Sequence, residues 1–243
     1  MVFIKIDNIE LNYIKLGKGN PFIFLHGIFF DSSPYKELID ILSNFYTVYA
    51  IDLPMHGKSE KPKKYLSIPN FSELLKEFII RLNIKNPIIC AHSAGSLIAI
   101  DYASKNKIKE LILIGPAGIK YYNYKIVLLF QIIVVKTLFS IFWSPIKALS
   151  NLKVNLYNLF RNIFNKNFWI LFNKNFKKDY SSKMKKIKCP TKLVWAKYDE
   201  ITPLKYASDF QKNIKNSKLI VIKGSHDWPV LRPKEIMKYV KSE

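Results

Sequence analysis

Cysteine is scarce in this sequence of 243 residues, and its two copies stand about a hundred positions apart. Cys90 and Cys189 form no C-x-x-C pair and belong to no cysteine and histidine cluster with the spacing of a metal site. We therefore expect neither a disulfide framework nor a zinc site, and we expect a reducing compartment. Cys90 is predicted to be a small hydrophobic residue of the core.

The sequence also lacks the features of exported or loosely linked chains. It contains no internal repeat, no low-complexity tract and no glycine-rich linker. Residues 1–13 alternate apolar and polar side chains and include Asp7 and Glu10, which is typical of a strand rather than a signal peptide. We predict a cytoplasmic protein. Its length suits one domain with an insertion and allows a large core.

Acidic residues are few, with 18 Asp and Glu against 39 Lys and Arg and a formal net charge of +21. The excess is local, because residues 119–188 hold 14 basic residues and one acid, Asp179. This segment is apolar and no recognised nucleic-acid motif is present, so we expect no nucleic-acid partner. Two interpretations stay open. The lysines form a solvated face, or they draw the segment to anionic membranes, where each contributes about 1 kcal/mol.

Eight short segments have the composition of strands. From the third onward they are continuous apolar runs, the pattern of strands buried on both faces of a parallel sheet. Helical stretches separate them, which predicts an α/β fold with an eight-stranded, mostly parallel, doubly wound sheet. The predicted strands are residues 3–6, 11–15, 22–25, 47–51, 87–90, 110–114, 192–195 and 218–222. The predicted helices are residues 35–42, 71–82, 95–105, 204–213 and 233–241.

The strand pattern stops after the sixth strand. Residues 119–187 are rich in aromatic side chains, asparagine and lysine, and they contain no strand pattern. We interpret them as a helical cap inserted into a core that consists of residues 1–118 and 188–243.

The first part of this cap, residues 126–143, is nearly apolar over 18 positions, which is the lower edge of membrane-spanning length. A glutamine and Lys136 interrupt it, and Ser144 and Pro145 have the pattern of a helix N-cap followed by a first-turn proline. The segment therefore favours an amphipathic helix followed by a second helix. Lys125 and Lys136 lie on one side of the first helix and are the residues expected to meet an anionic surface.

Ser93 carries the strongest chemical signal. It lies in Ala91-His92-Ser93-Ala94-Gly95, between a predicted strand and a predicted helix. A sharp corner of this kind needs a positive φ at its central residue and tiny side chains two positions to either side, because the two backbones pass close together. Such a corner lifts a hydroxyl out of a sheet as a nucleophile. A buried serine at an ordinary turn is the alternative.

A serine nucleophile needs a base, and the base needs an acid that orients it. Of the four histidines, His226 follows the last strand, from which its loop can reach the corner. Asp199, just after the seventh strand, is the candidate acid, with Glu200 and Asp227 as alternatives. His92 is predicted to point away from the serine. His26 and Asp52 are predicted to brace their loops.

These motifs together resemble those of the α/β hydrolases, in which serine, acid and histidine follow one another in this order. The corner resembles the G-x-S-x-G nucleophile elbow, and the resemblance extends to His26-Gly27 after the third strand and to DLPMHGKS at residues 52–59 after the fourth. The sequence departs from the family pattern at Ala91, Met55 and Ala196, where glycine is usual.

The resemblance implies an esterase-like or lipase-like serine hydrolase without metal or other cofactor. Ser93 would attack, His226 would act as the base, and Asp199 would orient it. The backbone N–H of Ala94, at the start of the helix after the elbow, would be one donor to the oxyanion. The family pattern adds the backbone N–H of Ile28 as the second donor. The apolar cap favours a small ester with an apolar acyl group. Amide or iminopeptidase cleavage, carbon–carbon bond hydrolysis and a non-catalytic ligand-binding module stay open, as does a peripheral membrane location.

Overall fold

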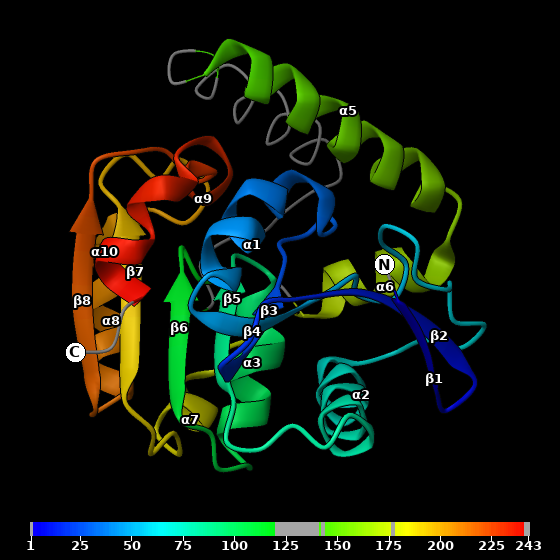
Figure 1. Ribbon diagram of the computed structural model, residues 1–243, viewed down its shortest axis with the longest axis horizontal. Coiled ribbons are helices and arrows are strands. Elements are labelled where there is room, and N and C mark those ends of the chain that lie inside the picture. Colours follow the sequence, from blue (N-terminus) through cyan, green and yellow to red (C-terminus); the bar gives the residue numbers. More distant parts are fainter. Residues whose placement is uncertain (1, 120–140, 142–143, 176–177, 241–243) are drawn as a thin grey trace.

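The computed structural model describes residues 2–119, 141, 144–175 and 178–240, and its centre is an eight-stranded sheet (Figure 1). The strand order is β1-β2-β4-β3-β5-β6-β7-β8. All eight predicted strands are present and begin and end within two residues of the predicted positions. They are β1 (Val2–Ile6), β2 (Ile9–Leu16), β3 (Asn20–Leu25), β4 (Tyr46–Ile51), β5 (Ile88–His92), β6 (Glu110–Ile114), β7 (Thr191–Ala196) and β8 (Ser217–Ile222).

The amino-terminal strands form an antiparallel hairpin at one edge of the sheet. β1 pairs with β2 so that Ile6 lies opposite Ile9, and the turn takes positive φ at Asp7 and Asn8, 47° and 64°. Asp and Asn tolerate this conformation better than most residues, which suits a two-residue hairpin turn. β2 also pairs antiparallel with β4, and the five remaining strand pairs are parallel. The predicted α/β class with a mostly parallel sheet is confirmed.

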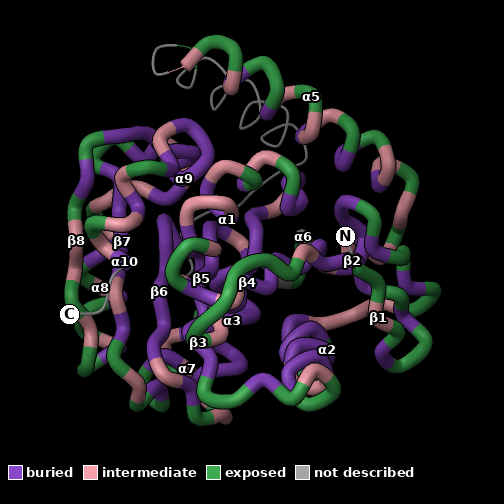
Figure 2. The backbone as a smooth tube through the Cα atoms, in the orientation of Figure 1, coloured by how far each residue is buried: buried purple, intermediate pink, exposed green. Residues whose placement is uncertain are grey.

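Helices cover both faces of the sheet. One face carries α1 (Lys36–Ser43), α9 (Trp228–Leu231) and α10 (Met237–Val240), and the other carries α2 (Ile68–Arg81), α3 (Gly95–Ala103), α7 (Ser181–Met184) and α8 (Ala207–Asn213). Three predicted helices begin with 3₁₀ turns, at Ser33–Tyr35, Leu204–Tyr206 and Pro233–Glu235, as helix starts often do. Every residue of β5 and β6 is buried between the two helical layers, as the continuous apolar runs predict (Figure 2).

The segment between β6 and β7 contains α5 (Pro145–Asn162), α6 (Lys166–Asn175) and α7. α5 begins at Pro145 with Ser144 as its N-cap, as predicted. It crosses the end of the sheet toward which the arrows of β6 and β8 point (Figure 1). Within the described ranges, no helix is long and apolar enough to cross a membrane. The predicted helix over residues 126–143 falls almost wholly outside those ranges, as do Lys125 and Lys136.

The short helix α7 packs on the core. Tyr180 and Met184 are buried in the same apolar cluster as residues of α3 and α8. The N–H of Tyr180 also donates to the carbonyl of Gly118, 2.8 Å away. The chain therefore returns to the core before β7 begins.

Candidate active site

Ser93 occupies a strained corner between β5 and α3. Its φ is +52°, in the left-handed region that residues other than glycine rarely adopt. The backbone of α3 passes close to the end of β3 at Gly95. A Cβ there would lie 2.6 and 2.8 Å from the carbonyl oxygens of His26 and Leu25. Ala91, which stands where the family usually has glycine, is fully buried in β5. The added methyl group is therefore accommodated inside the sheet.

His226 and Asp199 form a buried pair from two neighbouring loops. Nδ1 of His226 lies 2.9 Å from each carboxylate oxygen of Asp199, and both side chains are 1% exposed. Thr202 holds the carboxylate in turn, with its backbone N–H 2.7 Å from one oxygen and its hydroxyl 3.0 Å from the other. Because a carboxylate only accepts, Nδ1 carries the hydrogen. Nε2 of the neutral imidazole is then the proton acceptor.

The loop after β6 lies between the pair of His226 and Asp199 and the corner at Ser93, and it contacts both. Gly115 has a φ of +47°, and a Cβ there would lie 2.8 Å from Oδ2 of Asp199 and 3.3 Å from the ring of His226. On the other side, the N–H of Ser93 donates to the carbonyl of Ile114 at 2.9 Å. Ser93, Asp199 and His226 are therefore gathered around one loop at the carboxyl end of the sheet, where parallel sheets bind ligands.

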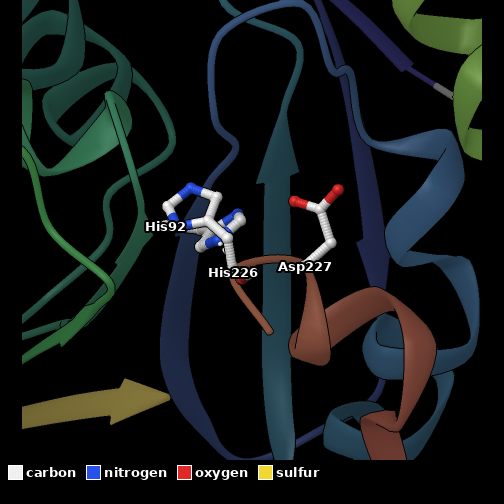
Figure 3. Close-up of side chains that lie close together, drawn as sticks. All are labelled: His92, His226 and Asp227. Atoms are coloured by element: carbon white, nitrogen blue, oxygen red, sulfur yellow. Dashed lines mark hydrogen bonds between the residues drawn. The ribbon is translucent and has the colours of Figure 1, made fainter. Parts of the chain in front are cut away.

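His92 packs its ring on that of His226, with centroids 4.8 Å apart and planes inclined by 37° (Figure 3). Nε2 of His92 lies 3.1 Å from the carbonyl oxygen of His226, and Nδ1 lies 2.7 Å from the hydroxyl of Tyr35. The carbonyl only accepts, so Nε2 donates and Nδ1 accepts from the hydroxyl. The sequence alone does not indicate that His92 contacts His226, because the two histidines stand 134 positions apart.

His92, His226 and Asp227 each bring one potential metal ligand to a common place, within 4.8 Å of one another (Figure 3). Both ring nitrogens of His92 are already engaged, one with Tyr35 and one with the His226 carbonyl. A metal ion would have to break one of these bonds. We interpret His92 as the middle of a hydrogen-bonded chain from Tyr35 to the backbone of His226 rather than as a metal ligand.

The carboxylate of Glu200 lies beside the backbone of His226. Its Oε2 accepts the N–H of His226 at 3.0 Å, whereas Oε1 is buried without a hydrogen-bond partner in the described part of the chain. Burial raises the pKa of Glu200 to about 7; His226 opposes the shift, and Asp227 and Asp199 add to it. Glu200 thus changes its charge beside His226 near neutral pH. Of the candidate acids, Asp199 has both carboxylate oxygens 2.9 Å from Nδ1 of His226.

A small apolar cavity of about 40 Å³ lies beside the corner. It is lined by Gly27, Ile28, Leu53, His56, Ile68, Phe71, Ala94, Leu97, Ile98 and, from α6, Leu171. Ile28 and Ala94 are the residues expected to donate to an oxyanion, and neither backbone N–H is used in a hydrogen bond among the described residues. A Cβ at Gly27 would lie 3.2 Å from Cβ of Ser93, so this loop passes directly beside the serine.

Two residues predicted to brace their loops do so. Nε2 of His26 accepts the N–H of Leu53 at 2.9 Å, and its Nδ1 lies 2.8 Å from the carbonyl of Gly27. Asp52 accepts two backbone N–H groups at 2.8 and 3.0 Å. Burial lowers the pKa of His26, and it lowers that of His56 to about 3. Both rings are therefore neutral near pH 7, and the bracing of His26 holds the loop that carries the candidate oxyanion donor.

A wider depression, of about 610 Å³, lies at the opposite end of the sheet. Its lining includes Lys105, Lys107, Lys109, Lys186 and Lys188, near the amino ends of β6 and β7. None of the candidate catalytic residues lines it. Its position at the amino ends of parallel strands makes it a poor candidate for the reaction site.

The order of the elements and the position of the corner match a known family. The family model of the alpha/beta hydrolase fold covers residues 20–232, which is most of the chain. The chain belongs to the α/β-hydrolase fold family. This confirms the resemblance inferred from the elbow and from residues 52–59.

Sequence relatives with curated names match only part of this α/β hydrolase. One is the dihydrolipoyllysine-residue acetyltransferase component of an acetoin cleaving system from Cupriavidus necator, 27% identical over 119 residues, which are 48% of this chain and 32% of the relative. Another is the (E)-2-((N-methylformamido)methylene)succinate hydrolase of Acinetobacter baylyi, 29% identical over 92 residues, which are 38% of this chain and 35% of the relative. The match spans about a third of these relatives' length.

Solved structures share the fold over nearly the whole chain. A thermophilic esterase from Thermogutta terrifontis superimposes with a TM-score of 0.81 at 18% identity, covering 96% of this chain and 92% of its own. Est816, described as an N-acyl homoserine lactone degrading enzyme, gives a TM-score of 0.83 at 19% identity, covering 98% of both chains. At these identities the likeness shows the fold.

Proposed function

We propose that this α/β hydrolase is a serine hydrolase that cleaves carboxylic esters with a short apolar acyl group. The observation that carries the proposal is the buried pair of His226 and Asp199, connected to the corner at Ser93 by the loop that contains Gly115. Nδ1 of the imidazole faces a carboxylate, which leaves Nε2 for a proton. A hydroxyl, an imidazole and a carboxylate are the three groups that acyl transfer of this type uses.

In the proposed reaction, Nε2 of His226 takes the proton of the Ser93 hydroxyl while the oxygen attacks the ester carbonyl. Asp199 holds Nδ1 and stabilises the imidazolium that forms. The imidazolium then gives its proton to the departing alkoxide, which leaves as the alcohol and forms acyl-Ser93. Water, deprotonated by the same nitrogen, attacks the acyl group, and the acid leaves as Ser93 recovers its proton.

Charge develops on the carbonyl oxygen in both steps, and the N–H groups of Ile28 and Ala94 are the proposed donors. Their availability supports this role, because neither is used elsewhere among the described residues. Ala94 is also the N-cap of α3, where the helix dipole favours negative charge. Removal of one such donor typically lowers kcat by about a hundredfold to a thousandfold.

The size of the apolar cavity favours a short acyl chain. A water-sized group needs about 10–15 Å³ measured in this way. A cavity of about 40 Å³ therefore has room for roughly three such groups. We therefore expect acyl chains of about two to four carbons to fit this space.

Labelling with a fluorophosphonate tests the nucleophile. Wild-type protein should be labelled, and Ser93→Ala should lose both labelling and turnover of p-nitrophenyl butyrate. Ser96→Ala is the matched control, because Ser96 is a fully buried serine in the first turn of α3. It should keep the label. Unlabelled wild-type protein that still binds an ester reversibly would instead identify a non-catalytic ligand-binding module.

A series of p-nitrophenyl esters from acetate to dodecanoate tests the acyl class, and matched p-nitroanilides test the bond type. The proposal expects the highest kcat/KM at two to four carbons and esters preferred over anilides. Faster anilide cleavage would point to an amidase or iminopeptidase. Labelling without cleavage of either series would leave carbon–carbon bond hydrolysis as the function of the same three residues.

The remaining partners of this hydrolase are predictions from its sequence. The basic cap is expected to meet anionic membranes through Lys125 and Lys136, which lie outside the described residues. A cytoplasmic location and the lack of a nucleic-acid partner are likewise expectations. The same three residues would also serve amide cleavage or carbon–carbon bond hydrolysis, which the ester and anilide series distinguish.

A further inference from the structure

Helix α5 buries four asparagines together with Ala148 and Leu159, and it turns several large apolar side chains toward solvent. Its inner asparagines are nearly inaccessible: Asn151 is 5% exposed, Asn155 3%, and Asn158 and Asn162 0%. The opposite side, here called the outer stripe, consists of Ile146 (84% exposed), Leu149 (60%), Tyr157 (58%), Phe160 (65%) and, just after the helix, Phe164 (97%). At about 100° per residue, the centres of the two sets lie about 170° apart. An ordinary surface helix has the reverse arrangement.

Hydrogen bonds to the core hold two of these asparagines, Asn158 and Asn162, on the inner side, whereas Nδ2 of Asn151 is buried without a hydrogen-bond partner among the described residues. The side-chain oxygen of Asn158 accepts the N–H of Gly57 at 3.0 Å, and its amide nitrogen donates to Asp31 at 3.1 Å. The amide of Asn162 donates to the carbonyl of Met55 at 2.7 Å. These contacts set the rotation of α5 about its own axis. The outer stripe therefore faces solvent because its opposite side is bonded to the polar loop after β4.

The outer stripe is larger than the scattered apolar residues of an ordinary surface. Burying a side chain such as Phe, Leu or Ile completely is worth about 1.5–3 kcal/mol, so five exposed ones along one side of a helix represent a large unused stabilisation. Exposed apolar surface that is concentrated in this way marks a site of interaction with a protein or a membrane. In Figure 2, exposed residues recur on the turns of α5 that face away from the sheet.

The charge around the outer stripe selects a membrane. Residues 144–175, which contain α5 and α6, hold five Lys and Arg and no acid, and one of the five, Lys147, pairs with Glu37 at 2.6 Å. Lys153 is exposed within the outer stripe, between Leu149 and Tyr157, and Lys166 is exposed near its end. An anionic bilayer offers an apolar boundary for the aromatic rings and negative headgroups for the lysines. Lysine stems reach such headgroups while their methylenes stay on the apolar side.

We propose that the outer stripe of α5 docks on the surface of an anionic lipid bilayer, with the helix parallel to the membrane plane. Lys153 and Lys166 then lie at the level of the headgroups. α5 crosses the same end of the sheet at which Ser93 and His226 are found (Figure 1). Docking therefore turns the active-site end of the molecule toward the bilayer. The proposal concerns binding and stands independently of ester hydrolysis.

Co-sedimentation with liposomes tests the proposal. Wild-type protein should pellet with vesicles of phosphatidylcholine and phosphatidylglycerol at 7:3, and at least tenfold less with phosphatidylcholine alone. The double variant Phe160→Ser and Phe164→Ser should lower the partition coefficient on the mixed vesicles at least tenfold. Phe45→Ser is the matched control, since Phe45 is 47% exposed but precedes β4 at the amino ends of the parallel strands. It should pellet like wild type.

A second pair of variants tests the charge. Lys153→Glu with Lys166→Glu should weaken pelleting, more so at low salt because screening is weaker there. Lys212→Glu with Lys215→Glu changes the net charge equally on exposed residues of α8 and the loop after it, and it should have little effect. Equal losses in both double variants would reduce the attraction to net charge alone and overturn the role of the outer stripe.

Further outcomes separate this proposal from its alternatives. No pelleting by wild type, or equal pelleting by wild type and the double phenylalanine variant, would overturn it. So would a dimer of the free protein in sedimentation velocity that the phenylalanine variant abolishes, because a second copy would then cover the outer stripe. Ser93→Ala should pellet like wild type. The phenylalanine variant should hydrolyse a soluble short-chain ester at the wild-type rate, so failure of the proposed activity and failure of docking give different results.

Discussion

The carbonyl oxygen of His226 accepts a hydrogen bond from Nε2 of His92 at 3.1 Å, and the two imidazole rings pack 4.8 Å apart. His92 directly precedes Ser93. One of these two neighbours therefore forms the corner, and the other holds the loop that carries His226. Tyr35 extends the chain of bonds, with its hydroxyl 2.7 Å from Nδ1 of His92. His92 thus positions the loop of the proposed base, and both of its own nitrogens are engaged.

Replacing Tyr35 by Phe should destabilise the protein by about 1–3 kcal/mol, because it leaves the buried Nδ1 of His92 without its donor. Urea unfolding at pH 7.5 measures the change. Tyr46→Phe is the matched control: its buried hydroxyl lies 3.4 Å from the carbonyl of Val240, a weaker bond, so its loss should cost less. Equal effects of the two substitutions would contradict a special role for the Tyr35 hydroxyl.

Asp199→Asn should lower kcat for p-nitrophenyl acetate on the order of 10⁴-fold. The amide keeps the shape of the carboxyl group but favours the wrong tautomer of His226. Steady-state kinetics measures the effect, with circular dichroism to check the fold. Asp227→Asn is the comparison, because Asp227 is a buried carboxyl group next to His226 in the sequence. A loss below tenfold in Asp199→Asn, together with a large loss in Asp227→Asn, would transfer the role to Asp227.

Glu200→Gln should move the acid limb of the kcat/KM profile to lower pH. A negative charge on Glu200 favours the protonated form of His226, which cannot act as a base, and glutamine keeps the hydrogen-bond acceptor without the charge. A profile from pH 4.5 to 8.5 measures the shift. Glu73→Gln, on the outer side of α2, should leave the midpoint unchanged. An upward shift in Glu200→Gln would refute this electrostatic coupling.

His56→Phe should make the unfolding free energy less sensitive to acid. The pKa of His56 is lowered to about 3 by burial, against an ordinary value near 6.5, so below about pH 6.5 the unfolded chain binds a proton that the folded protein excludes. Between pH 6 and 4, wild type should lose about 1.4 kcal/mol per pH unit relative to the variant. Urea titrations at pH 6, 5 and 4 measure the difference. A constant difference would show that His56 is not held neutral.

The predicted strands and the corner at Ser93 depend on short-range patterns. Apolar runs of four to six residues specify buried strands because both faces of the central sheet are covered, as the full burial of β5 and β6 shows. The corner depends on the small size of Ala91 and Gly95 within one stretch of five residues. These features were therefore predictable, and the α/β class and the family are confirmed.

The contacts of individual side chains depend on loops that are far apart in the chain. His92 meets His226 across 134 positions, and Asn158 meets Asp31 across 127. No periodicity indicates such partners, because each contact exists only after the sheet has brought the loop ends together.

The orientation of α5 shows the same limit. Its amphipathic pattern is visible in the sequence, but which side faces the protein depends on whether the surface beneath it offers apolar side chains or hydrogen-bonding groups. The sequence by itself determines the strands and the corner, since these follow from local sterics and burial, and its resemblance to the α/β hydrolases implies the order of the candidate triad. The tertiary structure alone decides that Asn158 and Asn162 of α5 face inward, because the polar loop after β4 supplies hydrogen bonds to both.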